Sequence, residues 1–104
     1  MIKVKVIRTG GCITGFDVSG HSGYSEAGSD IICASVSSAA YMTANTVTDI
    51  LGLNPVINEK DGSLSLSLRS DEAEKARDIL EGFALHIKEL AKQYPDYIIL
   101  ERGA

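Results

Sequence analysis

One histidine and one cysteine stand on either side of a glycine-rich segment, and together they could perform nucleophilic catalysis. His21 ends a strand-like stretch, residues 22–29 read SGYSEAGS, and Cys33 follows where an apolar segment begins. A cysteine attacks a carbonyl carbon as the thiolate, and a nearby imidazole can accept the thiol proton and later protonate a departing amine. This pairing predicts Cys33 as a nucleophile and His21 as its general base and acid.

A helix predicted to begin at Asp30 would also stabilise the reactive sulfur. Ser29 or Asp30 suits the N-cap position, which would put Cys33 in the first helical turn. There the unpaired N–H groups and the helix dipole favour a thiolate, and the same N–H groups could hold an oxyanion. The structural alternative is equally simple. A free cysteine early in a helix is usually a small buried residue, and a strand-end histidine such as His21 is often a surface residue.

Other groupings of polar residues are weaker candidates. Residues 23–30 have the glycine spacing of a phosphate-binding loop, but Ser-Asp stands where Lys-Ser/Thr is needed, and Glu26 and Asp30 would repel a phosphate. Asp17 has the strand parity of His21 and could orient its ring, or be an exposed carboxylate. No zinc site or other cofactor is predicted, because the cysteines and histidines lack the paired spacing of zinc ligands; these residues are Cys12, His21, Cys33 and His86.

Hydrophobic patterning predicts the order ββαββαβ for the elements that position these residues. Alternating apolar residues predict strands, with glycine turns between neighbours, at 2–6, 12–19, 55–57, 64–68 and 97–100. Helical spacing runs from Asp30 to Gly52, and again from a capping box of Asp71 and Glu74 as far as Pro95. Two amphipathic helices on a mostly antiparallel sheet predict a two-layer α/β sandwich of the α+β type.

Length and composition place limits on the function. A chain of 104 residues predicts one domain, residues 1–104, and a net charge of −4 argues against tight binding to bare nucleic acid. No apolar run approaches the ~18 residues of a membrane span, and the N-terminus has no signal-peptide pattern. Two cysteines do not form a disulfide framework in a chain of this size. Free thiols and a cytoplasmic location are therefore expected.

Residues 20–37 resemble the ribosomal-processing cysteine proteases, called Prp, of bacteria such as Firmicutes. The family pattern is Gly-His, a loop rich in small and acidic residues, and then D-I-(V/I)-C-A-x-x-S. Here Gly20 and His21 are followed by the loop and by DIICASVS at 30–37. Length and element order also agree, so the resemblance extends over essentially the whole chain.

The resemblance implies a dimeric endopeptidase that removes a short N-terminal extension from one large-subunit ribosomal protein. It implies that Cys33 is the nucleophile and His21 the general base and acid. Asp30, which would cap the helix or orient His21, and Ser37, one turn after Cys33, are further motif positions with supporting roles. In such an enzyme, the two glycines of the loop would let it close over the peptide; they are Gly23 and Gly28.

Two other hypotheses stay open at this point. The chain could be a non-enzymatic ribosome-assembly or protein-binding module in which Cys33 is merely packed, or it could use the same cysteine for acyl transfer or redox chemistry. The many Ala, Ser and Thr residues between 34 and 46 suit close approach to a neighbour. A homodimer is therefore expected, with a peptide substrate and without nucleic-acid or membrane partners.

Overall fold

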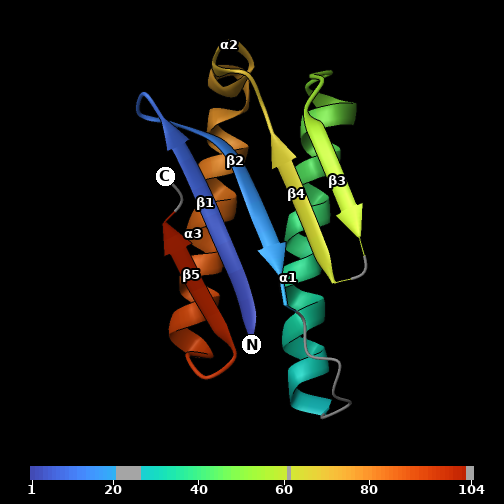
Figure 1. The fold of residues 1–104 in the computed structure, drawn as a ribbon, viewed down its shortest axis with the longest axis vertical. Coiled ribbons are helices and arrows are strands. Elements are labelled where there is room, and N and C mark those ends of the chain that lie inside the picture. Colours follow the sequence, from blue (N-terminus) through green and yellow to red (C-terminus); the bar gives the residue numbers. More distant parts are fainter. Residues whose placement is uncertain (21–26, 61, 103–104) are drawn as a thin grey trace.

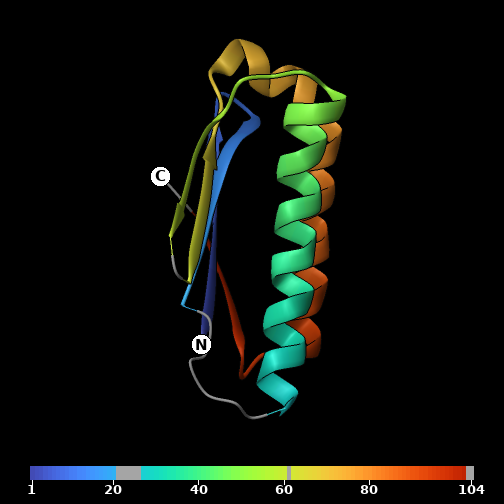
Figure 2. The same ribbon diagram turned by 90° about the vertical axis from the view of Figure 1, so that its right-hand side faces the viewer.

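The computed structural model describes the backbone of residues 1–20, 27–60 and 62–102. Five strands form one sheet, and the long helices lie side by side on one of its faces (Figures 1 and 2). The strands are β1 (Ile2–Thr9), β2 (Cys12–Ser19), β3 (Val56–Lys60), β4 (Ser63–Ser67) and β5 (Ile98–Arg102). The helical segments are α1 (Ala27–Asn45), the π-helical turn η1 (Thr46–Ile50), α2 (Ser70–Ala73), the 3-10 turn η2 (Glu74–Ala76) and α3 (Arg77–Gln93).

The strands lie in the order β3-β4-β2-β1-β5. The β1–β2, β2–β4 and β3–β4 pairs are antiparallel, and the β1–β5 pair is parallel. This arrangement confirms the predicted two-layer sandwich with a mostly antiparallel sheet. The first and last strands of the described chain are neighbours, with Ile2 opposite Ile98.

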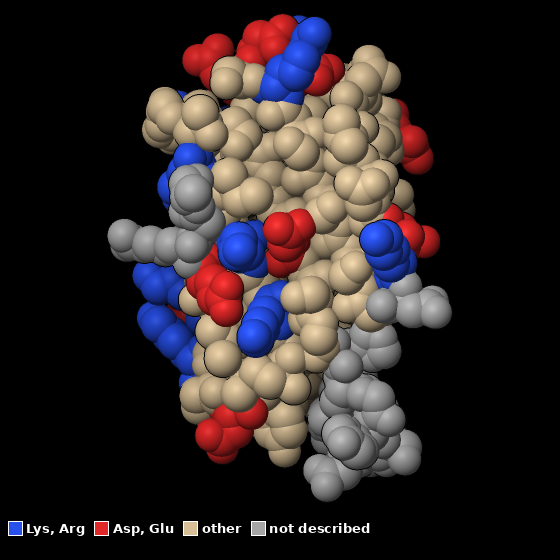
Figure 3. Space-filling model, in the orientation of Figure 1, with Lys and Arg blue, Asp and Glu red and all other residues tan. Residues whose placement is uncertain are grey.

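Alternation along the strands separates a core face from an open face. On β1, Val4 is fully buried while Lys3 and Lys5 are exposed, because successive side chains of a strand point to opposite faces. Phe16 of β2 packs on Phe83 of α3 with ring centroids 4.5 Å apart, which joins the two layers. In Figure 3 charged side chains of both signs lie across the middle and left of the open face, and a largely uncharged area separates them from the charged group at the top.

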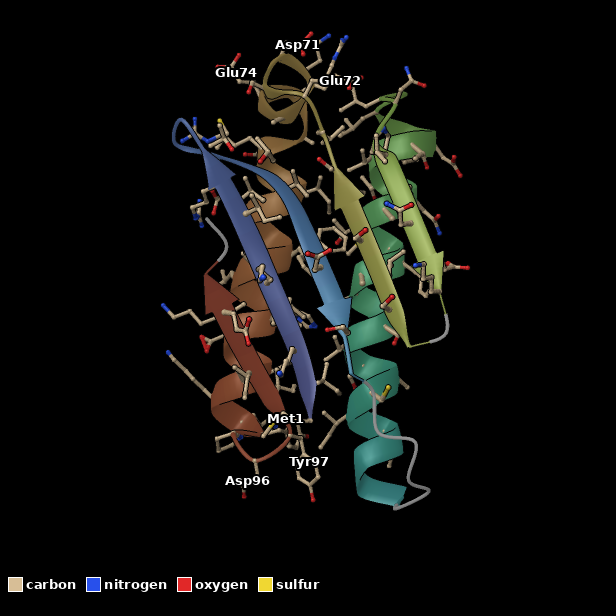
Figure 4. The ribbon with its side chains drawn as sticks, viewed as in Figure 1. Met1, Asp71, Glu72, Glu74, Asp96 and Tyr97 are labelled. Atoms are coloured by element: carbon tan, nitrogen blue, oxygen red, sulfur yellow. The ribbon has the colours of Figure 1, made fainter. Side chains whose placement is uncertain are left out.

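The second helical segment does not begin with the predicted capping box. It begins at Ser70, with Arg69 at the N-cap and no side-chain cap hydrogen bond. Glu72 is the acidic residue that holds this corner: it is 8% exposed, and its Oε2 accepts the Asn54 N–H at 3.1 Å. Figure 4 shows Asp71, Glu72 and Glu74 at the opposite end of the molecule from Met1 and Tyr97. Glu72 therefore joins the start of α2 to the loop before β3.

Two glycines offer a matched test of the packing. Gly15 lies on β2, where an added Cβ would collide with the backbone oxygen of Leu66, whereas a Cβ on Gly82 of α3 would meet nothing within 4 Å. We expect Gly15→Ala to lower the free energy of unfolding by about 1–3 kcal/mol. Gly82→Ala should raise it by about 0.5–1 kcal/mol, because alanine restricts the unfolded chain and favours a helix. Urea unfolding followed by circular dichroism measures both, and equal effects would contradict the packing of β2 on β4.

Candidate active site

A pocket of about 200 Å³ lies between α1 and the sheet, at the end where the β3–β4 hairpin turns. Cys33 and Ser37 line it from α1, and Lys60, Gly62 and Ser63 line it from the hairpin. Its remaining walls are mostly apolar and come from both layers: Ile2, Val18, Val36, Ala40 and Leu64, with Ser19 and Tyr41 beside them. A hollow with apolar walls and a few polar groups suits the side chain of a bound peptide.

Cys33 is half-buried and packs against the edge of the hydrophobic core while it lines this pocket. It is a free cysteine. Its side chain is therefore not sealed among apolar residues, as the structural alternative would require. Cys12, the other free cysteine, begins β2 at the opposite end of that strand from Ser19, a residue of the pocket wall.

The predicted start of the first helix is wrong by about one turn. The helix begins at Ala27, so Asp30 is its fourth residue rather than its cap, and Cys33 is its seventh. The dipole acts mainly within the first turn, and the free N–H groups of a helix are its first four. Neither the helix dipole nor the free N–H groups therefore act on the Cys33 sulfur as predicted. An acidic residue is favoured throughout the first turn as well as at the cap, so the sequence pattern does not fix this boundary.

The same shift changes the interpretation of the glycine-rich segment. Residues 27–29, expected to be loop, are the beginning of α1, so Gly28 is a helical residue and not part of a closing loop. His21 and Gly23 lie outside the described residues, as does the side chain of Asp30. The catalytic role of His21 and the supporting role of Asp30 stay predictions.

The end of β2 is fixed at the rim of the pocket. The Gly20 N–H donates to the Gly62 oxygen at 3.1 Å, and Gly62 itself lines the pocket. Gly20 has φ +77°, and an added Cβ would lie 2.7 Å from the Met1 oxygen, so this position requires glycine. Gly20, the residue before His21 in the sequence, therefore lies beside the pocket that contains Cys33.

Asp17 is on the wrong face of the sheet to serve this pocket. Its strand partners are Lys5 on β1 and Ser65 on β4. Its neighbours along β2, Phe16 and Val18, pack toward the helices, so Asp17 points to the open face. The hypothesis that Asp17 orients the catalytic histidine finds no support here.

Tyr41 lines the pocket and is hydrogen-bonded to Glu59, and neither residue was identified from the sequence. The Tyr41 hydroxyl donates to Glu59 Oε2 at 2.7 Å and so joins α1 to β3. Tyr41 follows Cys33 and Ser37 at successive intervals of four residues, so helical spacing was a signal that could have found it. Nothing in the sequence links it to Glu59, because the contact depends on how β3 lies against α1.

From the hydrogen bond between Tyr41 and Glu59 we predict that the Tyr41 phenol titrates at a higher pH than a free tyrosine. The bond to Glu59 raises the pKa of the Tyr41 phenol above its ordinary value of 10.0, because the neutral phenol donates to the carboxylate. The contribution of the Tyr41–Glu59 hydrogen bond to stability is therefore complete below pH 10. It is lost as the pH rises through the higher pKa of the phenol in the folded state. We expect Glu59→Gln to return the phenol toward its ordinary pKa. Ultraviolet titration, with Tyr41→Phe to assign the signal, checks this, and an unchanged titration in Glu59→Gln would contradict it.

Among the residues that the structure describes, no three His, Cys, Asp or Glu side chains come together in a group that could hold a metal ion. No helix in the described ranges has both the length and the apolar character needed to cross a bilayer. His86, on α3, is exposed and lies outside the pocket lining.

A family model described as "Cysteine protease Prp" matches residues 1–99. The chain belongs to the Prp family of cysteine proteases. It is similar to the ribosomal processing cysteine protease Prp of Bacillus subtilis (strain 168), with 27% identity over 90 residues, which are 81% of this chain and 80% of that one. The Prp of Staphylococcus aureus (strain Mu50) is 26% identical over 103 residues, 96% of this chain and 97% of that one.

Two solved structures have the same fold as this chain. The S. aureus ribosomal processing protease Prp in complex with a substrate peptide superposes with a TM-score of 0.89 at 24% identity, over 99% of this chain and 100% of that chain. SMU.848 from Streptococcus mutans gives a TM-score of 0.84 at 28% identity, over 98% and 93%. The fold class expected from the hydrophobic patterning and the family expected from residues 20–37 are confirmed, and the Prp family is a family of hydrolases.

Proposed function

We propose that this Prp-family protease removes the N-terminal extension of a bacterial large-subunit ribosomal protein, with Cys33 as its nucleophile. The observation that carries the assignment of Cys33 is its position in the wall of an open pocket, whose rim also holds the residue before His21. The type of substrate is supported by two relatives that are named as ribosomal processing cysteine proteases.

In the proposed reaction, His21 takes the proton of Cys33, and the sulfur attacks the scissile carbonyl carbon. His21 then donates that proton to the departing amine as the C–N bond breaks, which leaves a thioester that water hydrolyses. Because Cys33 lies in the second turn of α1, its ionisation depends on the imidazole rather than on the helix terminus. Ser37 lines the pocket one turn after Cys33. Asp30 lies on the same helix, α1, one turn before Ala34.

The enzyme is proposed to be a single-domain, cytoplasmic homodimer. One hydrophobic cluster joins the sheet and both long helices, which supports one domain over residues 1–104. No residue between 31 and 48 is charged, and along α1 Ile31 and Met42 are 67% and 54% exposed. This uncharged, partly apolar face of α1 suits contact with the same face of a second copy. In a symmetric dimer a charged face would meet its own like charges and be repelled. Both cysteines are free, as expected in a reducing compartment.

The test is cleavage of a synthetic peptide that spans the extension and mature start of the host's own ribosomal protein. Mass spectrometry should show one cut that releases the extension, and a scrambled peptide should stay intact. A non-enzymatic binding module would leave both peptides whole, and iodoacetamide would label Cys33 slowly near neutral pH. An acyl transferase or redox protein would label quickly but give other products.

A further inference from the structure

The pattern of hydrogen bonds in the sheet shows which backbone groups of β3 are free. Leu68 N–H donates to Thr14 oxygen at 2.7 Å, and Gly20 N–H donates to Gly62 oxygen at 3.1 Å. Both belong to the β2–β4 register, in which Gly15 faces Ser67. In an antiparallel pair, bonded residues alternate with unbonded ones, so the even-numbered residues of β4 bond to β2.

The odd-numbered residues of β4 must therefore bond to β3. They are Ser63, Ser65 and Ser67, and their partners are Lys60, Asn58 and Val56. The two residues between those partners, Ile57 and Glu59, turn their N–H and C=O groups away from β4. β3 is the border strand of the sheet, and no further strand in the described ranges pairs with it (Figure 1). Its free edge thus offers two donors and two acceptors with the spacing of a strand.

This edge leads directly to the catalytic pocket. β3 ends at Lys60, which lines the pocket, and the Glu59 side chain is bonded to Tyr41, which lines it too. Tyr41 is eight residues after Cys33, or about 12 Å along the helix at ~1.5 Å per residue. An extended peptide covers that length in about four residues.

We propose that the peptide substrate adds to the free edge of β3 as a sixth strand. Its residues about four to seven positions from the scissile bond pair with Ile57 and Glu59, and the chain then passes Tyr41 to reach Cys33. This inference rests on the proposed function and specifies how the extended substrate is held. Edge pairing is a common means of peptide recognition, because main-chain hydrogen bonds supply affinity whatever the side chains are. The side chains of Ile57 and Glu59 point toward α1, so both the edge and the helix contact the peptide.

An N-methyl scan of the cleaved peptide tests the proposal on the unaltered enzyme. Each amide from four to seven residues on either side of the scissile bond is methylated in turn, and kcat/KM is measured. On one side, alternate positions should lose about tenfold, since each loses one hydrogen bond, while the positions between them change little. A flat profile on both sides, with the parent peptide still cleaved, overturns the β3 edge alone. If the parent peptide is not cleaved, the proposed function itself fails.

Substitutions on β3 provide a second measurement. Ile57→Pro removes the outward N–H without removing a bond to β4, and proline is tolerated where the N–H of an edge strand faces outward. Ile57→Val keeps that N–H and is the matched control. We expect kcat/KM for the long peptide to be about tenfold lower in Ile57→Pro than in Ile57→Val. If Ile57→Pro instead dissociates a dimer in sedimentation and leaves kcat/KM unchanged, the edge binds a second copy and the proposal is wrong. If it unfolds, the peptide scan decides.

Discussion

Cys33→Ala should abolish cleavage of the ribosomal-protein peptide, with kcat/KM reduced by roughly 10⁴-fold or more. Alanine has no atom that can attack the carbonyl, and loss of a catalytic nucleophile has effects of this size in other proteases. Cys33 is half-buried beside the core, and alanine is smaller, so the fold should persist. Cleavage followed by mass spectrometry, together with thermal unfolding, separates lost chemistry from lost structure.

The chain supplies a matched control in Cys12. It is also a free, half-buried cysteine packed against the core, but it begins β2 and is absent from the pocket lining. Cys12→Ala should keep kcat/KM for cleavage within about twofold of the parent enzyme. It reports any general effect on stability of replacing a half-buried cysteine by alanine. Undiminished cleavage by Cys33→Ala would refute the proposed mechanism, and equal losses in both variants would point to stability instead.

His21→Ala should lower kcat/KM by about 10²–10⁴-fold, the usual contribution of a positioned general base and acid. In the proposed mechanism the imidazole both removes the thiol proton and returns it to the amine, so its loss affects two steps. The pH dependence of kcat/KM should lose the limb that reflects imidazole titration. Iodoacetamide should also label Cys33 more slowly at neutral pH, because the imidazolium no longer stabilises the thiolate.

His86→Gln is the corresponding control for the histidine. His86 is exposed on α3 and does not line the pocket. Its substitution should change neither the pH profile nor the labelling rate. A His21→Ala enzyme that kept the parent pH profile would show that another group acts as the base.

The elements and the family could be predicted from local patterns. Alternation fixed the core side of β1, where Val4 is buried and Lys5 exposed, and the short motif at 30–37 indicated the family. Helical spacing also placed Ser37 and Cys33 on one stripe. These features depend on neighbours within a few residues, so the sequence contains them.

The remaining features depend on contacts between distant segments. Glu72 joins the start of α2 to the loop before β3, since its carboxylate accepts the N–H of Asn54, eighteen residues earlier. The Tyr41–Glu59 bond depends on how β3 lies against α1. The start of the first helix at Ala27 could not be predicted either, because several polar residues in succession suit either a cap or a first turn. Local patterns leave each of these open.

The parallel pairing of β1 with β5 has a consequence for how this enzyme matures. Ile98 fills its place in the core only after the rest of the domain has been synthesised, and until then one side of β1 lacks its neighbour. A nascent or truncated chain that stops before residue 98 therefore lacks β5 beside Ile2, and Ile2 is a residue of the pocket wall. Proteolytic competence should therefore depend on the synthesis and pairing of β5, and formation of the helix that carries Cys33 should not be sufficient.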